Sequence, residues 1–198
     1  MYMTHTKGLF NIQYLHTITT GMKMKKIIAL TACTLLATGC SNDVDLVKNG
    51  VMDFNQTTTL GKALDNWSSC DSTSWDSFET DNGVRVVEFT CDHHIDDFFK
   101  KAKRLLEKSN IKEVEHFDVE KNIHYYQFTL NQDNTFQFDN AQSLTTWKNG
   151  KTYEDSIDGM SQLERAYRDE RTFNPDELNS MSAGYLSMML EVTSRKAK

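Results

Sequence analysis

Acidic residues are missing from the first forty positions of this 198-residue chain. All 28 Asp and Glu residues lie from Asp43 onward, whereas 4 of the 22 basic residues fall in the first forty positions. The stretch from 27 to 38 is uncharged and mostly apolar, but it has only 12 residues. A helix that crosses a bilayer needs about 20 apolar residues, so this stretch is too short to span one. A basic start followed by a short apolar run predicts a secretory signal peptide.

Proline and catalytic motifs are also scarce. Pro175 is the single proline, which argues against a proline-rich linker. The chain has no G-x-S-x-G nucleophile elbow and no glycine-rich phosphate loop. From residue 40 onward 18 basic residues (22 minus 4) face 28 acidic ones, a balance of −10 that argues against nucleic acid as a partner. We therefore predict no catalytic residue, no cofactor and no metal ion.

The apolar stretch ends in Ala37-Thr38-Gly39-Cys40. This tetrapeptide resembles the lipobox of bacterial lipoprotein precursors, in which small residues precede an obligatory cysteine. The resemblance implies cleavage before Cys40 and acyl chains on Cys40 that attach the protein to a membrane. Ser41, in place of Asp, resembles the pattern that sorts such proteins to the outer membrane, on its periplasmic face. The alternative is an ordinary signal peptide with a chance cysteine.

The chain divides into four segments on these grounds. Residues 1–21 precede a complete signal and suggest a start-site error, with a long basic region as the alternative. Residues 22–39 form the expected signal peptide, and 40–50 read as a polar tether. Residues 51–198 have the length of a single periplasmic domain.

The cysteines divide in the same way. The chain has four, of which Cys33 lies in the signal and Cys40 is the expected lipidation site. Cys70 and Cys91 remain, and in an oxidising compartment we expect them to form a disulfide. Two free thiols are the alternative. Because Cys70 follows a predicted helix and Cys91 ends a predicted strand, the bond is expected to join helix to sheet.

Hydrophobic spacing predicts an α+β fold. A short strand at 51–54 is followed by a helix at 60–67, capped by the threonines before it. Two strands, 74–80 and 84–91, flank an Asp-Asn-Gly turn. The clearest helix is 95–108, whose apolar stripe comprises Ile95, Phe98, Phe99, Ala102, Leu105 and Leu106.

Four more strands and two helices complete the prediction. The strands are 112–119, 122–130, 135–140 and 142–148, and the helices are 156–168 and one from Pro175 to about 194, capped by Asn174 with Glu177 in its first turn. We expect an antiparallel meander of about six strands, packed with a central amphipathic helix and two C-terminal helices. Residues 57–91 resemble a segment of small uncharacterised bacterial envelope proteins, which implies fold and location but no activity.

Two pairs of histidines are weak metal candidates. His93 and His94 are adjacent, beside Asp92 and Asp96, and a solvated helix start is the favoured interpretation. His116 and His124 are expected to face each other across a hairpin, but two ligands without a third make a poor site.

The last helix presents the one candidate binding surface. Met181, Tyr185, Met188 and Met189 lie on one broad face, and methionine suits adaptable interfaces. A stripe at helical spacing is usually core, so core packing is the favoured interpretation and partner binding the alternative. We expect a non-enzymatic accessory, inhibitor or scaffold that binds another envelope protein. An envelope hydrolase with a site assembled from scattered residues is the alternative, and a deep pocket with several perturbed ionisable groups would favour it.

Overall fold

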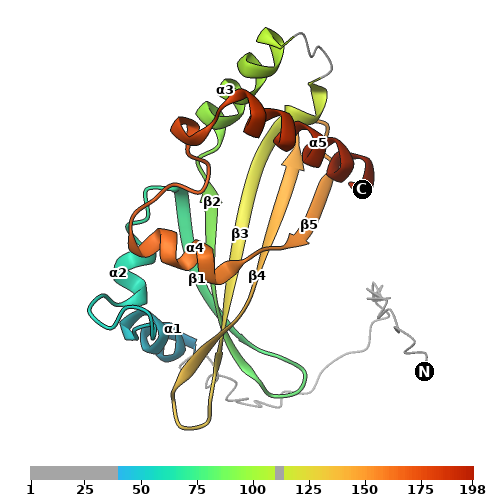
Figure 1. The fold of residues 1–198 in the computed structure, drawn as a ribbon. Helices are drawn as coiled ribbons and strands as arrows, with labels where there is room; N and C mark the ends of the chain where they lie inside the picture. The colour runs from blue at the N-terminus through green and yellow to red at the C-terminus, as the bar shows by residue number, and fades with distance from the viewer. Residues whose placement is uncertain (1–39, 110–113) are drawn as a thin grey trace, which may run out of the picture. The chain divides into compact units, whose positions relative to one another are not determined.

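The computed structural model describes residues 40–109 and 114–198, which belong to one compact unit (Figure 1). Its helices and strands occur in short runs along the chain, as is typical of an α+β fold. In order they are α1 (Cys40–Asn49), α2 (Leu60–Leu64), β1 (Cys70–Glu79), β2 (Arg85–His93), α3 (Asp96–Lys108), the 3-10 turn η1 (Glu115–Phe117), β3 (Val119–Leu130), β4 (Phe136–Trp147), β5 (Thr152–Ser156), α4 (Gly159–Tyr167), the 3-10 turn η2 (Pro175–Glu177) and α5 (Ser180–Lys196).

The sheet is an antiparallel meander in the order β1-β2-β3-β4-β5, which confirms the predicted fold class. It has five strands rather than about six. The expected strands 135–140 and 142–148 form the single strand β4, because Asn140 and Ala141 continue the pairing with β3. The prediction missed β5, whose sequence TYEDS is mostly exposed and has no apolar alternation.

Two other expected strands are absent from the described residues. Residues 115–117 form η1, so the strand predicted at 112–119 begins only at Val119, and 110–113 lie outside the described residues. Residues 51–54 form a turn held by one isolated bridge between Met52 and Asn55. Both stretches are short, and a short apolar run does not specify a strand by itself.

The predicted hairpin and disulfide are confirmed, but the bond joins other elements than expected. Gly83 adopts φ 77° in the turn between β1 and β2, a conformation that favours glycine. Cys70 and Cys91 are bonded with their Cα atoms 5.4 Å apart. Cys70 is the first residue of β1 rather than the end of a helix, because α2 stops at Leu64. The disulfide therefore links two neighbouring strands, not a helix to the sheet.

One face of the sheet carries the core. Alternate residues of β2 (Val87, Phe89 and Cys91) are completely buried, as are Tyr126 and Phe128 of β3. Period-two alternation puts these side chains on one face, and helices cover that face (Figure 1). Two clusters of apolar side chains fill the space between the helices and the sheet. The first cluster joins α1, α2 and α4 to the middle of the sheet. The second cluster joins α3, α5 and η1 to the end of the sheet that contains Val119 and Trp147.

Helix α3 follows its prediction closely. Phe99, Ala102 and Leu106 are buried, while Phe98 and Leu105 pack partly against the second cluster. In its first turn, Asp97 accepts two hydrogen bonds from Arg171, which lies beyond α4 in the chain.

Residues 40–49, expected to form a tether, are the helix α1. Val47 is completely buried among core residues, and Asp43 forms an ion pair with Arg85 of β2. Gly61 of α2 meets the side chain and carbonyl of Lys48 so closely that an added Cβ would lie 3.0 Å away. The segment is thus part of the packed domain.

The last helix begins later than predicted. Asn174 caps only the 3-10 turn η2, after which Leu178 is extended and nearly buried. Asn179 then starts α5 with a capping box: its side chain accepts from Ser182 N, and Ser182 Oγ accepts from Asn179 N. The interruption lets Leu178 reach the second cluster, a tertiary demand that overrides the local capping signal.

Candidate functional site

The side of α5 that points away from the domain is apolar. Met181, Tyr185 and Met188 are exposed to 85%, 65% and 66%, and Met189 and Val192 to 47% and 51%. The favoured expectation of core packing is therefore wrong for these side chains. We call Met181, Tyr185, Met188, Met189 and Val192 the α5 outer face.

The opposite side of α5 is also apolar, which explains how the helix is held. Ala183 is completely buried and Leu190 nearly so, both in the cluster that includes α3. Ser187 lies beside them, and its hydroxyl bonds to His116 Nε2 at 2.8 Å. A helix that is hydrophobic all round is normally buried on all sides. Helix α5 is buried on one side only, so its outer face is an unpartnered surface among the described residues.

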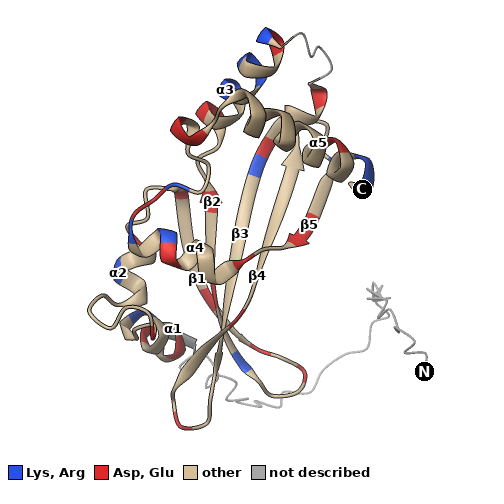
Figure 2. Ribbon diagram, viewed as in Figure 1, with Lys and Arg blue, Asp and Glu red and all other residues tan. Residues whose placement is uncertain are grey.

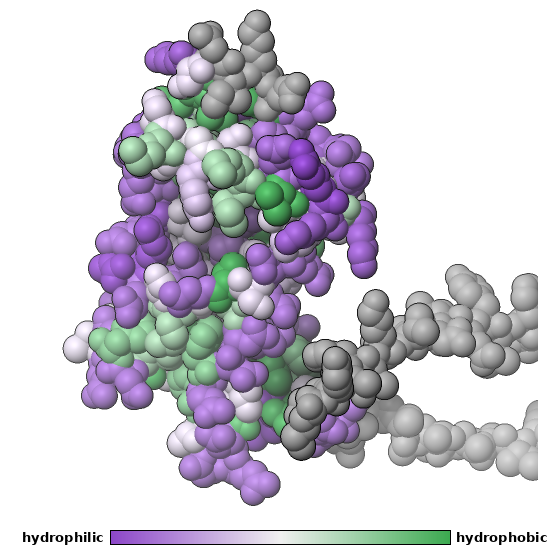
Figure 3. All heavy atoms as spheres, turned by 45° about the vertical axis from the view of Figure 1, so that its right-hand side comes forward, coloured by the Kyte–Doolittle hydropathy of each residue, from purple (hydrophilic) through white to green (hydrophobic). Residues whose placement is uncertain are grey.

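Charged groups lie next to this face. Figure 3 shows green side chains gathered in the upper part of the surface, where α5 lies, with hydrophilic side chains beside them. Figure 2 shows lysine and arginine at the C-terminal end of the helix. These are Arg195, which pairs with Glu191 one turn earlier, and Lys196. The surface thus combines an apolar centre with a polar rim, the usual anatomy of a protein interface.

A second feature is a pair of buried histidines that the sequence did not suggest. The rings of His93 and His124 lie 4.2 Å apart, centroid to centroid, at 2% and 4% exposure. In the pairing of β2 with β3, His124 lies opposite Cys91. Cys91 and His93 are two residues apart on β2, so all three side chains lie on the same face of the sheet. The sequence pattern places His124 opposite His116, so it does not reveal the contact between His93 and His124.

The environment of the pair keeps it neutral. His93 Nδ1 lies 2.9 Å from Ser69 Oγ, and its Nε2 has no hydrogen-bond partner. Burial lowers the pKa of His93 to about 4, against smaller opposing effects of the Ser69 backbone and Asp71. Burial also lowers the pKa of His124, and the neighbouring His93 adds to this.

The predicted histidine pairs are separated in the fold. His94 is half-exposed and pairs with Asp71 at 2.8 Å, away from the buried ring of His93. His116 bonds to α5, whereas His124 packs against His93. Among the described residues, a metal-ligand cluster is formed by Cys70, Cys91 and His93. Its two sulfurs are bonded to each other, so neither is a thiolate that could hold an ion.

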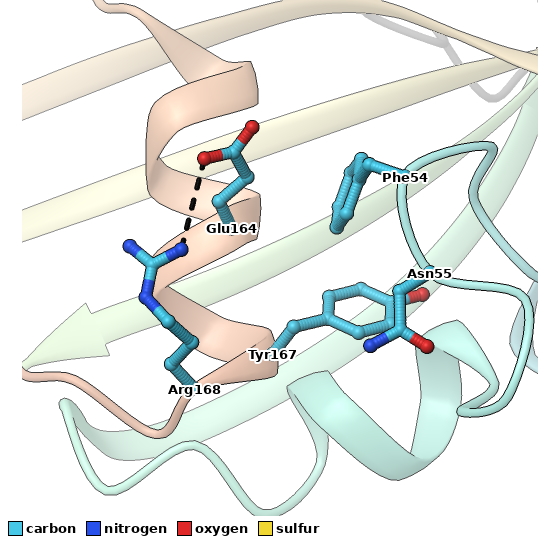
Figure 4. Close-up of a pocket in the computed structure, with 5 residues that line it drawn as sticks. All are labelled: Phe54, Asn55, Glu164, Tyr167 and Arg168. Carbon is cyan, nitrogen blue, oxygen red and sulfur yellow. Dashed lines mark ion pairs between the residues drawn. The ribbon is translucent and has the colours of Figure 1, made fainter.

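A hollow beside ionisable groups lies between α4 and the turn before α2 (Figure 4). Phe54 packs edge-on against Tyr167, with ring centroids 5.0 Å apart. Across from them Glu164 and Arg168 form an ion pair of 3.7 Å. Arg168 also makes two bonds to Glu170. The acid and the base of this hollow thus neutralise each other, and no histidine, serine or cysteine lines it.

Comparison with protein-family models, curated proteins and solved structures finds no match to this chain. Among residues 40–109 and 114–198, no helix combines the length and the apolar character needed to cross a bilayer.

Proposed function

We propose that this chain is a lipid-anchored protein of the bacterial outer membrane that works on the periplasmic side by binding another envelope protein. The α5 outer face is the observation that carries this proposal. Large apolar side chains at this degree of exposure cost solubility, and contiguous exposed apolar patches mark interaction sites. Binding, rather than catalysis, is the function that such a surface serves.

The proposed anchor rests on Ala37-Thr38-Gly39-Cys40. The packing of α1 gives this anchor a mechanical consequence. Val47 of α1 is fixed in the core. A lipid on Cys40 would therefore hold the domain within three helical turns of the membrane, without a long flexible linker.

The position of α5 suits a partner away from the anchor. Leu130, at one end of β3, lies in the cluster that contains Val47 of α1. Val119, at the other end, lies in the cluster that contains Leu190 of α5. They are the two ends of the twelve-residue strand β3, so eleven steps of ~3.3 Å, or about 36 Å, separate them. A domain held at α1 can therefore present α5 well away from its attachment point.

The hydrolase alternative has weaker support. The imidazoles of His93 and His124 are among the most buried polar groups described, and Phe173 packs on both. General acid–base catalysis needs a group within reach of the substrate. The buried pair lacks that access, and the hollow between α4 and the preceding turn holds only a mutually paired acid and base.

The anchor is tested by Cys40→Ala. We expect the variant to remain unprocessed or to be released from membranes, because the acyl chains have no other attachment point in the proposal. Fractionation of cells followed by detection of the protein measures this. Normal processing and membrane attachment of Cys40→Ala would contradict the anchor.

The binding surface is tested by placing a photo-crosslinking amino acid at Met188 in living cells. A matched control carries it at Lys100 of α3, whose side chain is 71% exposed but lies outside the α5 outer face. We expect a discrete crosslinked product for position 188 and none for position 100. Absence of a product at 188, with normal amounts of protein, would argue against partner binding by this face.

A further inference from the structure

The α5 outer face has the spacing of a coiled-coil seam. Met181, Tyr185, Met188 and Val192 follow one another at intervals of four, three and four residues. This is the alternation of the a and d positions of a heptad, with Tyr185 and Val192 at a and the two methionines at d. All four side chains are exposed. A seam of this kind is completed by another helix with the same spacing.

We propose that the partner of this face is α5 of a second copy of this chain, packed in parallel about a two-fold axis. The proposal rests on the function proposed above and names the partner of that same surface. In a parallel pair each seam residue meets its own counterpart, so Tyr185 packs on Tyr185 and Met188 on Met188 of the second copy. A two-fold contact uses the same surface on both copies. The interface would therefore consist of α5 from one copy and α5 from the other.

The seam is free to pair because of how α5 is mounted. Ala183 and Leu190 occupy the heptad position opposite the seam, and both are buried against the domain. The seam therefore points away from the body of the protein.

The residues that flank the seam complement one another in charge and size. In parallel coiled coils a g residue meets the e residue five positions later on the partner helix. Glu191 at g would meet Lys196 at e, an acid opposite a base. Gly184 at g would meet Met189 at e, the smallest residue opposite a long one. Both matches follow from a self-pairing in this one register.

Gly184 has no role in the packing of its own chain. It lies inside a helix, where glycine costs about 1 kcal/mol relative to alanine. No atom lies within 4 Å of a Cβ built on it, and its φ is not positive, so neither packing nor backbone conformation within this chain requires glycine. A glycine at this position leaves room for the long side chain of Met189 from a second helix.

The size of the seam implies a weak, concentration-dependent dimer. Obligate dimers bury roughly 2,000 Å² or more, whereas this surface consists of five side chains, two of them about half exposed. Attachment of both copies to one membrane would raise their effective concentration. The pairing is therefore best measured in the membrane with the full chain.

Cysteine crosslinking in cells tests the register. Met181→Cys and Val192→Cys lie at opposite ends of the seam, eleven residues or about 16 Å apart along the helix. In a parallel pair each variant meets its own counterpart, so each should form a disulfide-linked dimer on mild oxidation. Lys100→Cys on α3 is the control for chance collision and should give none, as should the unaltered chain. An antiparallel pair would separate both engineered cysteines from their counterparts, so the absence of dimers for both would overturn the parallel pairing.

A charge in the seam tests its energetics in the same assay. Adding Met188→Glu to Val192→Cys places two carboxylates against each other, and we expect the dimer yield to fall about tenfold or more, which corresponds to ~1.4 kcal/mol. Adding Lys100→Glu instead should leave the yield unchanged. Because Met188 is exposed, the substitution should not unfold the domain, and an unchanged thermal melt of the variant checks this. An unchanged yield with Met188→Glu would overturn the proposal.

The crosslinking outcomes also separate this inference from the proposed function. If the cysteine variants form no dimer but the photo-crosslinker at Met188 still captures a different protein, the binding function stands and self-pairing is wrong. If neither gives a product, both are wrong. If the photo-crosslinked product has twice the mass of the chain and the cysteine dimers form, self-pairing through the α5 outer face is supported, and binding of a different envelope protein by this face is not.

Discussion

Mild acid should destabilise this domain through His93 and His124. Both rings are almost completely buried and in contact with each other. Burial lowers the pKa of His93 from 6.5 to about 4, and it lowers the pKa of His124 as well. The neutral imidazoles are thus tolerated in the core, whereas the protonated forms are not.

The direction of the effect follows from the two pKa values of His93. In the unfolded chain the imidazole takes up a proton as the pH falls through about 6.5, but the folded chain resists this until about pH 4. Stability is therefore fully present above pH 6.5 and declines between pH 6.5 and 4. Each tenfold difference in proton affinity between the folded and the unfolded chain corresponds to ~1.36 kcal/mol. His93 alone should therefore lower the free energy of unfolding by about 3 kcal/mol at pH 4. His124 adds to this loss.

The carboxylates act in a lower range of pH. Arg171 lowers the pKa of Asp97, and Lys103 lowers the pKa of Asp118. Their ion pairs stabilise the fold above the ordinary carboxyl pKa of about 3.9 and are lost only below it. A loss of stability between pH 6.5 and 4 is thus attributable to histidine. The pKa of His116 is lowered as well, so the contribution of His93 has to be isolated by substitution.

Urea unfolding at a series of pH values from 8 to 4 measures this contribution. His93→Phe keeps a ring in contact with Trp67 and Phe173 but removes the titrating group. The variant lacks the hydrogen bond to Ser69 at every pH. The test is therefore how the difference in free energy of unfolding between the variant and the unaltered chain changes with pH. We expect the variant to gain about 3 kcal/mol relative to the unaltered chain between pH 6.5 and 4. A pH-independent difference for His93→Phe would refute the reasoning.

Three further substitutions have definite expectations. Replacing Cys70 and Cys91 by serine removes a bond across 21 residues and should lower the free energy of unfolding by about 3 kcal/mol; equal stability of the oxidised chain and the variant would contradict this. Gly159→Ala should destabilise by ~1–3 kcal/mol, since an added Cβ would lie 2.3 Å from the ring of Phe138. Gly184→Ala should instead stabilise the isolated domain by ~0.5–1 kcal/mol, because nothing lies near that Cβ. Thermal melts of the two glycine variants compare them directly, and shifts in the same direction would be unexpected.

Local features were predictable where a short stretch carried the whole signal. The turn at Gly83 and the alternation of Val87, Phe89 and Cys91 specify the β1–β2 hairpin without help from the rest of the chain. The apolar stripe of α3 is likewise complete within thirteen residues. The disulfide followed from the count of cysteines once Cys33 and Cys40 were assigned to other roles.

Predictions failed where distant residues decide the outcome. The break between η2 and α5 exists because Leu178 packs in the second cluster, which the capping signal at Asn174 does not reveal. Strand β5 forms because the edge of β4 offers hydrogen bonds, not because its own sequence is apolar. Pairing energy of this kind comes from the neighbouring strand and is invisible to a local pattern.

The sequence by itself determined the composition of each surface, whereas the tertiary structure decided which surfaces are covered. Helical spacing placed Met181, Tyr185, Met188 and Met189 on one face of a helix, and no more than that. Only the packed structure shows that Ala183 and Leu190 face the core and that the methionine side is exposed. The register of β2 and β3 likewise brought His93 and His124 into contact. The physical reason is the same in both cases: a chain pattern defines faces and periods, but the contact between two elements depends on all the other elements packed around them.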